Sequence, residues 1–558
     1  MEISELLKTL LDKRGISDTE SFLNPNYEDH CHDPLLLPDM KKALQRFFTA
    51  LERNEHIAIY TDFDCDGVAG AAVFSDFLEK IGYREAEVYM PHRDNEGYGF
   101  HEQAIRELQA RGTSLIITVD VGIAAAYEVS VANELGVDVI ITDHHEVMNE
   151  MPVALAIVNP KLGGYPFPHL CGAAVAYKFV QAALQEGRRR GLEQFLKIPE
   201  GWEKWLLDVV AIATVADMVP LVGENRVLAH FGLRVLRRTR RSGLIALAQV
   251  TRLRLHEITE DDIGFSIAPR INAASRMDSP CLALKLLTTR DVSEANRLAE
   301  QLEALNTKRK STVATIVRSA KKRARERFEE NTPVTVLGDT AWKPALLGLA
   351  ANSLMGDRGG VVCLWGRDAA GNLKGSCRSD GSISLSDLFK RTPQAFIQFG
   401  GHAHAGGFTV APERIHTLHE ELMEGYQKIL SEKMVRELQV MIHDATLSLS
   451  IISDSLIKEI SLLSPFGIGN PKPVFHISDA RITGVRAFGK EKNHIEVMLE
   501  CAHSGRTVRA FEFFKQPEHF TFAPAPGTSA NVLATVERDS YRGPSAVSLR
   551  IVDFLPTC

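Results

Sequence analysis

The stretch HIAIYTDFDCDGVAGAAVF, residues 56–74, decides the fold class of this chain. Its opening segment, His56 to Tyr60, is mostly apolar and is typical of a buried strand. Three carboxylates, Asp62, Asp64 and Asp66, follow directly, and a segment of small residues then indicates a helix that packs closely on a sheet. We therefore expect a strand, an acidic loop and a helix.

Two further runs of the same kind follow. Residues 115–119 form an apolar run that ends at Asp120, and residues 137–142 form another that ends in DHH at residues 143–145. Strands that alternate with helices predict a doubly wound parallel sheet and an α/β fold. Because ligand sites in such sheets form outside the carboxyl ends of the strands, we expect these polar side chains to meet at one edge.

That concentration of negative charge is tolerable only if cations neutralise it. Carboxylate oxygens and imidazole nitrogens suit hard divalent cations, and two ions about 3.5–4 Å apart can stabilise both the entering and the leaving oxygen of an in-line displacement. The sequence thus predicts a two-metal phosphoesterase that uses Mn²⁺ or Mg²⁺. The predicted metal ligands are Asp62, Asp64, Asp66, Asp120, His144 and Asp217, and the predicted catalytic residues are Asp64, Asp66, Asp120, His144, His145 and Asp217.

Asp120 is the expected bridge between the ions, because its strand should lie between the other two ligand-bearing strands. Taken alone, an Asp-x-Asp is usually a solvated turn and a His-His pair is usually a surface feature. Three such segments at strand ends, with Asp217 after a later helix, favour the metal site. Cys65 stands among the carboxylates and is interpreted as a packing residue.

The composition fits an intracellular enzyme. At 558 residues the chain is too long for one core, and its net charge of −7 argues against a uniformly basic nucleic-acid binder but permits a local basic channel. Eight scattered cysteines without a CxxC pair suit a reducing compartment and support neither a disulfide scaffold nor a thiolate zinc site. With no signal peptide and no apolar run of membrane-spanning length, we expect a cytoplasmic protein that does not contact membranes.

The remainder of the chain predicts further domains. Residues 291–328 contain neither Gly nor Pro and indicate one long connector helix, whose second half is strongly basic. That basic face is either a solvated surface or one wall of a nucleic-acid groove. Short alternating strands after about residue 441 predict a small barrel, with an OB-fold as the favoured form. The predicted divisions are 1–54 (N-terminal arm), 55–290, 291–330 (connector helix), 331–440 and 441–558.

Several motifs resemble the RecJ exonuclease family of the DHH phosphoesterase superfamily, which is named for Asp143-His144-His145. They occur in the family's order over nearly the whole chain: DFDCDG at 62–67, EGYG at 96–99, VADMVPL at 215–221, PRINAASR at 269–276, GSCRS at 375–379, GGHAHAGG at 400–407 and PFGIGNPKP at 465–473.

The resemblance implies a 5′→3′ exonuclease that acts on single-stranded DNA in recombination and repair. It implies that residues 55–290 form the DHH catalytic domain, residues 331–440 the DHH-associated domain and residues 441–558 the OB-fold domain, with the DNA end threaded between the two lobes. It also implies cooperation with a RecQ-type helicase and a single-stranded DNA-binding protein.

Phosphate contacts follow from the same resemblance, and an Arg fork suits them because it pairs two oxygens at once. The expected DNA-binding or phosphate-binding residues are Arg276, Asn272, Ser376, Arg378, Gly401 and His402. Aromatic side chains can stack on bases of a single strand, and the candidates are Tyr98 near the first lobe and Phe511, Phe513 and Phe514 in the barrel.

The chain departs from the family pattern at two positions. Tyr60 stands where many members of the wider superfamily carry His, and a tyrosine is a poor ligand at neutral pH. One ion is therefore expected to be held less tightly, or by Asp62 instead. Ser275 stands where Gly is common before the Arg, a small change.

Two rival functions are weighed. A DHH enzyme that cleaves short oligonucleotides, cyclic dinucleotides or pyrophosphate is expected to be shorter and to lack the barrel. A non-catalytic DNA-binding scaffold is disfavoured because every expected carboxylate is present.

Overall fold

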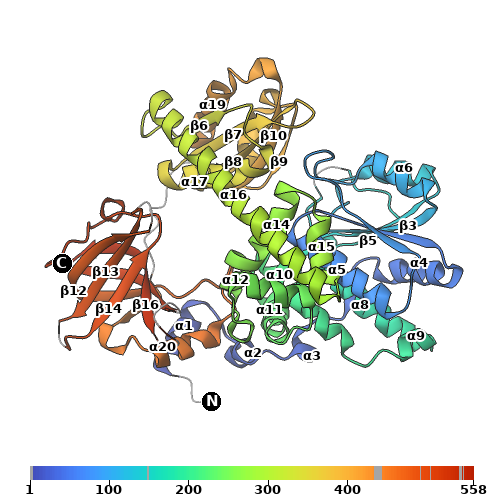
Figure 1. The fold of residues 1–558 in the computed structure, drawn as a ribbon, viewed down its shortest axis with the longest axis horizontal. Coiled ribbons are helices and arrows are strands. Elements are labelled where there is room, and N and C mark those ends of the chain that lie inside the picture. The colour runs from blue at the N-terminus through green and yellow to red at the C-terminus, as the bar shows by residue number, and fades with distance from the viewer. Residues whose placement is uncertain are drawn as a thin grey trace. The chain divides into compact units, whose positions relative to one another are not determined.

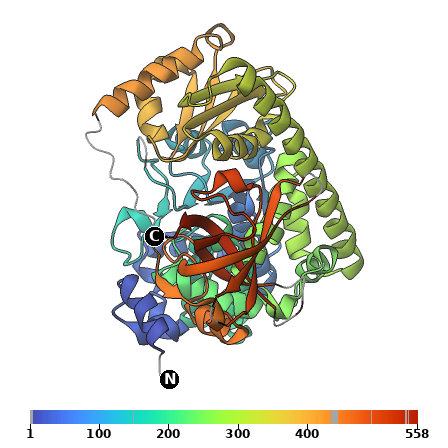
Figure 2. The same ribbon diagram turned by 90° about the vertical axis from the view of Figure 1, so that its left-hand side faces the viewer.

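The computed structural model describes residues 4–147, 150–432, 443–489, 492–502, 504–539, 543 and 546–557. The chain forms two compact units (Figures 1 and 2). The α/β unit comprises His32–Val219 and Phe231–Glu437, and the barrel unit comprises Met1–Cys31, Pro220–His230 and Leu438–Cys558. The predicted N-terminal arm, 1–54, is therefore divided between the two units after Cys31.

Sheet A of the α/β unit is parallel throughout, as the alternation of strands and helices predicts, with the spatial order β2-β1-β3-β4-β5. Its strands are β1 (His56–Thr61), β2 (Ala86–Tyr89), β3 (Thr113–Val119), β4 (Asp138–Thr142) and β5 (Ala156–Val158). As predicted, β3 lies between β1 and β4, so three of the polar segments leave adjacent strands at one edge.

Helices cover both faces of sheet A, which explains why its strands are apolar on both sides. One face carries α6 (Glu102–Ala110) and α7 (Ala126–Glu134). The other carries α4 (Met40–Arg53), α5 (Cys65–Lys80) and α8 (Gly172–Arg189). The small residues of α5 permit this packing, since a Cβ at Gly70 would lie 2.4 Å from Val119 Cγ1 of β3.

A helical segment completes this part of the α/β unit. Its elements are α9 (Glu193–Leu196), α10 (Leu207–Ala216), the end of α11 (Gly223–Leu236), α12 (Ser242–Thr251), α13 (Glu260–Asp262), a π-helix (Ile263–Ile267), α14 (Ala268–Met277) and α15 (Cys281–Thr288). The residues of α11 up to His230 belong to the barrel unit. The predicted connector is a single helix, α16 (Val292–Arg327), which runs from this segment to the second sheet (Figures 1 and 2).

Sheet B is the second sheet of the α/β unit and has the order β6-β7-β8-β10-β9. Its elements are β6 (Val334–Gly338), α17 (Pro344–Arg358), β7 (Val361–Arg367), β8 (Leu373–Ser379), α18 (Leu385–Arg391), β9 (Gln398–Gly401), β10 (Ala405–Val410) and α19 (Leu418–Glu432). Cys363 of β7 lies directly opposite Cys377 of β8, and a disulfide joins them. The cysteine spacing alone did not suggest this pair.

The barrel unit closes five long strands through pairing of β12 with β15, as the alternating pattern predicts. Its strands are β11 (Ala445–Leu447), β12 (Phe475–Phe488), β13 (His494–Cys501), β14 (Thr507–Glu512), β15 (Ser529–Arg538) and β16 (Val547–Pro556). Its helices are α1 (Glu5–Lys13), α2 (Thr19–Leu23), α3 (Tyr27–His30) and α20 (Asp454–Ile460), and leucines of α1 pack into the barrel core.

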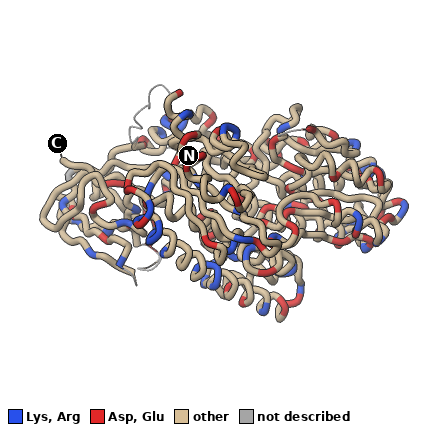
Figure 3. The backbone as a smooth tube through the Cα atoms, turned by 90° about the horizontal axis from the view of Figure 1, so that it is seen from above, with Lys and Arg blue, Asp and Glu red and all other residues tan. Residues whose placement is uncertain are grey.

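Short 3₁₀ turns connect these elements at Pro34–Leu36, Pro160–Leu162, Trp202–Leu206, Leu255–Glu257, Pro393–Ala395, Pro412–Arg414, Leu449–Ile451, Ser461–Leu463 and Pro517–His519. Within the described ranges, none of the helices combines the length and the apolar character needed to span a bilayer. Lys and Arg are interspersed with Asp and Glu along most of the chain (Figure 3).

Candidate functional site

The loop after β1 is shaped by its own aspartates. Asp64 is the N-cap of α5, and its Oδ1 accepts hydrogen bonds from the backbone N–H of Asp66 (2.9 Å) and Gly67 (3.2 Å). Capping by Asp satisfies donors that the first turn of a helix leaves unpaired. One carboxylate oxygen of Asp64 thus fixes the loop.

Asp66 is held by a second helix. Its carboxylate accepts hydrogen bonds from the N–H groups of Gly172 (2.6 Å) and Ala173 (2.8 Å), which begin α8. A helix N-terminus carries partial positive charge and favours an anion there. Asp66 is therefore fixed in position although its side chain is fully buried.

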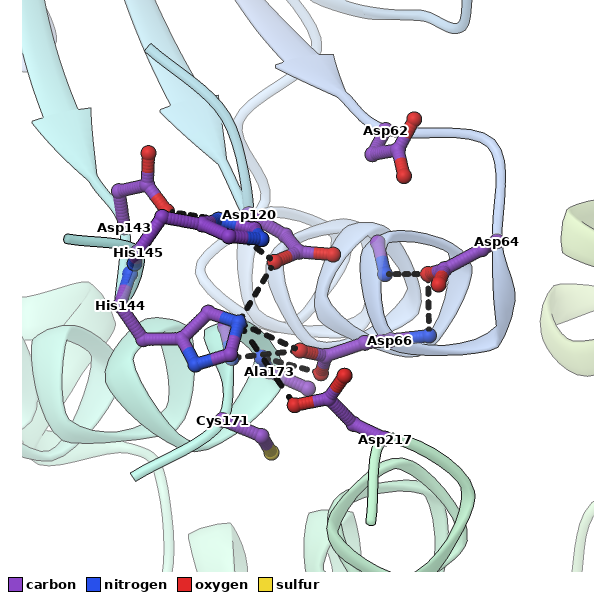
Figure 4. A network of polar contacts seen from close by, with 12 residues as sticks. Asp62, Asp64, Asp66, Asp120, Asp143, His144, His145, Cys171, Ala173 and Asp217 are labelled. Atoms are coloured by element: carbon purple, nitrogen blue, oxygen red, sulfur yellow. Dashed lines mark hydrogen bonds and ion pairs between the residues drawn. The ribbon is translucent and has the colours of Figure 1, made fainter. Parts of the chain in front are cut away.

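Asp120 follows β3 with φ of 59°, in the left-handed region that few non-glycine residues adopt. Such strained positions cluster at functional sites, where the surrounding structure enforces them. Its side chain projects toward His144 from the next strand, with 3.1 Å between Asp120 Oδ1 and His144 Nε2 (Figure 4).

His144 lies at the centre of the cluster (Figure 4). Its Nε2 lies 3.6 Å from Oδ2 of Asp217, which caps the C-terminus of α10, and 3.7 Å from Oδ2 of Asp66. Strand ends β3 and β4, helix α5 and helix α10 thus bring together residues that are far apart in the sequence.

His145 points to Asp143 instead. Their Nδ1 and Oδ1 atoms lie 2.8 Å apart, and Asp143 also accepts hydrogen bonds from the N–H groups of His144 and Ile123. These bonds and the facing imidazoles lower the pKa of Asp143 to about 2 although its burial opposes this. Asp143 therefore orients His145, a contact that sequence reasoning did not assign.

Asp62 lies on the opposite side of the cluster from His144 (Figure 4). One oxygen each from Asp62, Asp64 and Asp120 lie within 4.8 Å of one another. Tyr60 takes no part: it is completely buried, stacks on Tyr89 at 5.2 Å and donates a hydrogen bond from its hydroxyl to the carbonyl of Gly99.

The electrostatics of the cluster are those of crowded buried anions. Burial, followed by repulsion from neighbouring carboxylates, raises the pKa of Asp62 to about 8, of Asp66 to about 6 and of Asp217 to about 9. The same two causes raise the pKa of Asp120 well above its usual value. Burial lowers the pKa of His144 to about 3, which leaves its imidazole neutral and able to donate a lone pair.

These residues fit divalent cations. Within the described residues, four buried atoms that face the cluster make no hydrogen bond: Asp62 Oδ1, Asp120 Oδ1, His144 Nε2 and Asp217 Oδ2. Three groups of potential ligands share members. Asp120 belongs with Asp62 and Asp64 and also with His144 and His145, and His144 belongs in addition with Asp66 and Asp217. Oxygen donors with imidazole suit Mn²⁺ or Mg²⁺.

The guanidinium groups of two predicted phosphate ligands, Arg276 of α14 and Arg378 of β8, lie against the first turns of α17. Arg276 Nη1 donates a hydrogen bond to the carbonyl of Ala345 (2.7 Å), and a Cβ at Gly348 would lie 2.6 Å from Arg378 Nη2. Burial and the facing Arg93 lower the pKa of Arg276 to about 9. Both guanidinium groups are thus crowded and lack an acidic partner among the described residues, as anion-binding groups do.

Arg93 was missed by the sequence analysis. Its Cζ lies 4.6 Å from the ring centroid of Phe63, and it makes no hydrogen bond or ion pair to another described residue. Burial lowers its pKa, while Asp62 and Asp64 oppose that change. The sequence signal that could have identified Arg93 is the short strand β2. Arg93 follows the carboxyl end of β2, and β2 lies next to β1, so Arg93 is at the same edge of the sheet as the aspartates.

The other predicted phosphate ligands have different surroundings. Asn272 Oδ1 accepts a hydrogen bond from the N–H of Cys65 (2.9 Å), so it supports the loop that carries the ligands. Ser376 precedes Arg378 by two positions on β8, where it is half-buried. Gly401 pairs with Gly406 of β10, and the side chain of His402 is exposed.

Three family models match the chain. The DHH family, N-terminal domain, matches residues 56–214, the DHHA1 domain matches residues 331–428 and the RecJ OB domain matches residues 443–553. These matches cover in turn the metal cluster apart from Asp217, the segment with sheet B, and the barrel.

Curated relatives match nearly the whole chain. The single-stranded-DNA-specific exonuclease RecJ of Bacillus subtilis is 37% identical over 99% of this chain and 68% of its own length. The protein of the same name from Haemophilus influenzae is 31% identical over 91% of this chain and 89% of its own length.

Solved structures agree with these relatives. RecJ of Thermus thermophilus in complex with Mn²⁺ has a TM-score of 0.80 and 26% identity, and the match covers 99% of this chain and 76% of that one. An exonuclease RecJ bound to manganese has a TM-score of 0.60 and 29% identity over 70% of this chain and 95% of that one. From its motifs, its metal cluster and these relatives, the chain belongs to the RecJ exonuclease family.

Proposed function

We propose that this chain is a metal-dependent 5′→3′ exonuclease that hydrolyses single-stranded DNA in recombination and repair. The observation that carries this function is the set of clustered carboxylate and imidazole atoms at the carboxyl edge of sheet A that have no hydrogen-bond partner among the described residues. The relatives named as single-stranded-DNA-specific exonucleases support the choice of substrate.

Two divalent ions, Mn²⁺ or Mg²⁺, would be held by Asp62, Asp64, Asp66, Asp120, His144 and Asp217. When bound, such ions supply Lewis-acid activation of the phosphate and a water of lowered pKa. Asp120 is the proposed bridging ligand because it belongs to two of the ligand groups.

The remaining residues bind and orient the strand. Arg276, Arg378 and Arg93 neutralise phosphate oxygens, and Asn272 holds the ligand loop. Asp143 fixes the His145 ring through Nδ1, which directs its Nε2 away from Asp143. Tyr98 would stack on a base, a role supported by its exposure of 55% and by its ring centroid lying 6.2 Å from that of His145.

The proposed anchor for the 5′ end is the pair Ser376 and Arg378 of β8, with Gly401 and His402 at the end of β9, on the other side of β10. An anchor of this kind sets the distance from the terminal phosphate to the metal cluster, and so explains cleavage from one end. The barrel is a further site for the strand, since Phe513 and Phe514 are exposed and Arg550 Cζ lies 4.5 Å from the Phe513 ring centroid.

The test is digestion of end-labelled single-stranded, duplex and tailed DNA with Mn²⁺, with Mg²⁺ or with chelator. We expect mononucleotides to be released from single-stranded 5′ ends when Mn²⁺ or Mg²⁺ is present, and not when chelator is present. Asp120→Ala should abolish turnover and keep strand binding, and substantial residual hydrolysis would remove Asp120 from its bridging role. Faster cleavage of dinucleotides than of long strands would favour the rival oligonucleotide phosphodiesterase.

Family resemblance also suggests two partners and a cytoplasmic location. A RecQ-type helicase would supply the single strand and a single-stranded DNA-binding protein would keep it open, with the barrel as the contact surface. Binding of the purified proteins to wild-type chain and to a Phe514→Ala variant tests this, and equal binding would exclude that part of the barrel.

A further inference from the structure

The motif PFGIGNPKP, residues 465–473, belongs neither to the metal cluster nor to the predicted phosphate ligands. It lies in the barrel unit between the turn Ser461–Leu463 and β12. Gly467 and Asn470 form a tight turn at its centre, because the N–H of each donates a hydrogen bond to the carbonyl of the other, at 2.9 and 3.1 Å. The backbone of this 465–473 loop is therefore closed on itself.

Asn470 ties the loop to the rest of the barrel unit. Its side chain is 2% exposed, and its Nδ2 donates hydrogen bonds to the carbonyls of Leu463 and Pro465, both at 2.8 Å. Its Oδ1 accepts a hydrogen bond from Arg14 at the end of α1, and Arg14 Nη2 also donates to the carbonyl of Pro471 (2.6 Å). The loop is thus fixed on both sides of its turn.

The fixed loop holds the chain segment that follows Asp217. The N–H of Leu221 donates a hydrogen bond to the carbonyl of Ile468 (2.7 Å). A Cβ at Gly467 would lie 2.7 Å from Leu221 Cδ1, and a Cβ at Gly469 would lie 3.1 Å from Val222 Cγ1. The two glycines therefore allow the loop to approach this segment more closely than other residues could.

The same segment is held again at the start of α11. Arg226 Nη1 donates a hydrogen bond to the carbonyl of Leu463 (2.9 Å), and its guanidinium lies 3.7 Å from the ring centroid of Phe22. Asn225 Nδ2 donates to the carbonyl of Pro220 (3.1 Å). Residues 220–226 are thus anchored in the barrel unit by side chains as well as by the 465–473 loop.

Asp217 stands three residues before Pro220, and its carboxylate lacks the support that the neighbouring ligands have. Backbone N–H groups hold Asp64 and Asp66, whereas Asp217 Oδ2 accepts no hydrogen bond from any described residue (Figure 4). Asp217 is fixed through its backbone, whose N–H donates to the carbonyl of Ala213 at the end of α10 (2.8 Å). The direction of its side chain therefore depends on the path of the chain after α10.

That path contains a strained residue. Met218 has φ of 60°, a left-handed conformation that costs a non-glycine residue about 1–2 kcal/mol. Its side chain is 65% exposed, so packing of that side chain does not hold it there. Such a residue persists only where the surrounding structure enforces its conformation. The restraints on either side of Met218 are helix α10 and the held segment that begins at Pro220.

We propose that the 465–473 loop is a positioning element for Asp217. By holding Leu221 and Val222, the loop keeps Met218 left-handed and so keeps the Asp217 carboxylate directed into the metal cluster. This inference rests on the proposed function. It assigns a barrel motif to the metal chemistry of the α/β unit, through the chain that connects them.

The proposal concerns one of the two ions more than the other. Asp217 belongs to the ligand group of Asp66 and His144, whereas the ligand group that contains Asp62 and Asp64 has no member on the held segment. Release of the segment should therefore weaken one bound ion selectively. Loss of the fold would weaken both.

The first test is Mn²⁺ binding by Gly469→Ala, whose Cβ crowds the held segment. Its matched control is Gly505→Ala in the same unit: the two glycines have φ of 76° and 66°, but a Cβ at Gly505 meets nothing within 4 Å. Both variants carry similar backbone strain, and only Gly469→Ala pushes on Val222. Binding is followed by the electron paramagnetic resonance signal of free Mn²⁺, which requires no turnover.

We expect the Kd of one Mn²⁺ ion to rise about tenfold in Gly469→Ala, as when the support of a metal ligand is removed, and that of the other to change less than about threefold. Gly505→Ala should bind both ions like wild-type chain. Unchanged affinity in Gly469→Ala, equal weakening of both ions, or equal loss in the control overturns the proposal.

The second test changes Met218 itself, which a purely structural role of the loop would not involve. Met218→Val alone should weaken the same ion, because β-branched residues adopt the left-handed region least readily. Met218→Asn added to Gly469→Ala should restore Mn²⁺ affinity, because Asn tolerates that conformation without support from the loop. Absence of this rescue overturns the role of Met218 and with it the proposal.

Calorimetry of each variant shows whether the barrel unit is folded. If Gly469→Ala lacks the barrel transition, Gly467→Ala takes its place with the same expectations, because it crowds Leu221 and its φ lies outside the left-handed region. Failure of the proposed function looks different: wild-type chain would bind no Mn²⁺ and leave single-stranded DNA undigested.

Discussion

At the scale of single residues, Gly172 decides where two ligands lie. Its N–H holds Asp66, and a Cβ at this position would lie 2.5 Å from Asp120 Cβ and 2.9 Å from Asp120 Cα and Cγ. The space beside this glycine therefore belongs to Asp120, whose own backbone is in the left-handed region. A side chain here must displace the proposed bridging ligand.

Gly172→Ala should consequently lower kcat at least about 100-fold, because displacements of about 1 Å in an active site have that effect. The matched control is Gly356→Ala on α17, where a Cβ meets nothing within 4 Å and activity should be retained. Steady-state kinetics with Mn²⁺ checks both. A Gly172→Ala enzyme with full activity would show that Asp120 has room to move without losing its role.

At the scale of elements, one buried ion-pair network fixes the helices that carry the ligands. Arg241, just before α12, lies 2.6 Å from Asp76 of α5 and 3.0 Å from Asp208 of α10. Asp64 caps the start of α5 and Asp217 follows the end of α10. The network therefore sets the relative position of the two helices on which those ligands depend.

Arg241→Met should lower the free energy of unfolding of the α/β unit by about 3–5 kcal/mol, because it leaves the buried Asp208 without its cation and Asp76 with Arg290 as its remaining cation. The control is Arg238→Met, an exposed residue of the same loop, which should change stability by less than about 0.5 kcal/mol. Urea unfolding followed by circular dichroism measures both. Equal stability of the two variants would refute this role of the network.

At the scale of the whole molecule, cation binding should stabilise the α/β unit, since its crowded carboxylates repel one another when ionised. At a free Mn²⁺ concentration about 100 times the Kd, the gain is about 2.7 kcal/mol. Scanning calorimetry should show a rise in the melting temperature of the α/β unit over that with chelator.

Asp120→Ala is the control for this prediction and should lose most of the Mn²⁺-dependent shift. The transition of the barrel unit should be insensitive to Mn²⁺ in both proteins, because the predicted ligands all belong to the α/β unit. A barrel transition that responds as strongly would place metal binding elsewhere.

The sequence by itself determined the elements. Hydrophobic periodicity is local, so it predicted the connector 291–328, observed as Val292–Arg327, and the five barrel strands. It also predicted that β3 lies between β1 and β4, because the chemistry at the strand ends required a shared edge. The sequence analysis predicted neither the short strand β2 nor the position of Arg93, which follows that strand.

Only the tertiary structure decided which distant groups meet. Three contacts join residues whose proximity depends on packing between elements: the hydrogen bonds from α8 to Asp66, the disulfide between Cys363 and Cys377, and the hydrogen bond from Arg276 to the carbonyl of Ala345. Sequence spacing carries no information on such contacts, because the register of strands and the approach of helices are set by the core. The residue types therefore predicted a metal-dependent phosphoesterase site, and the packing of the elements determined which side-chain atoms come together there.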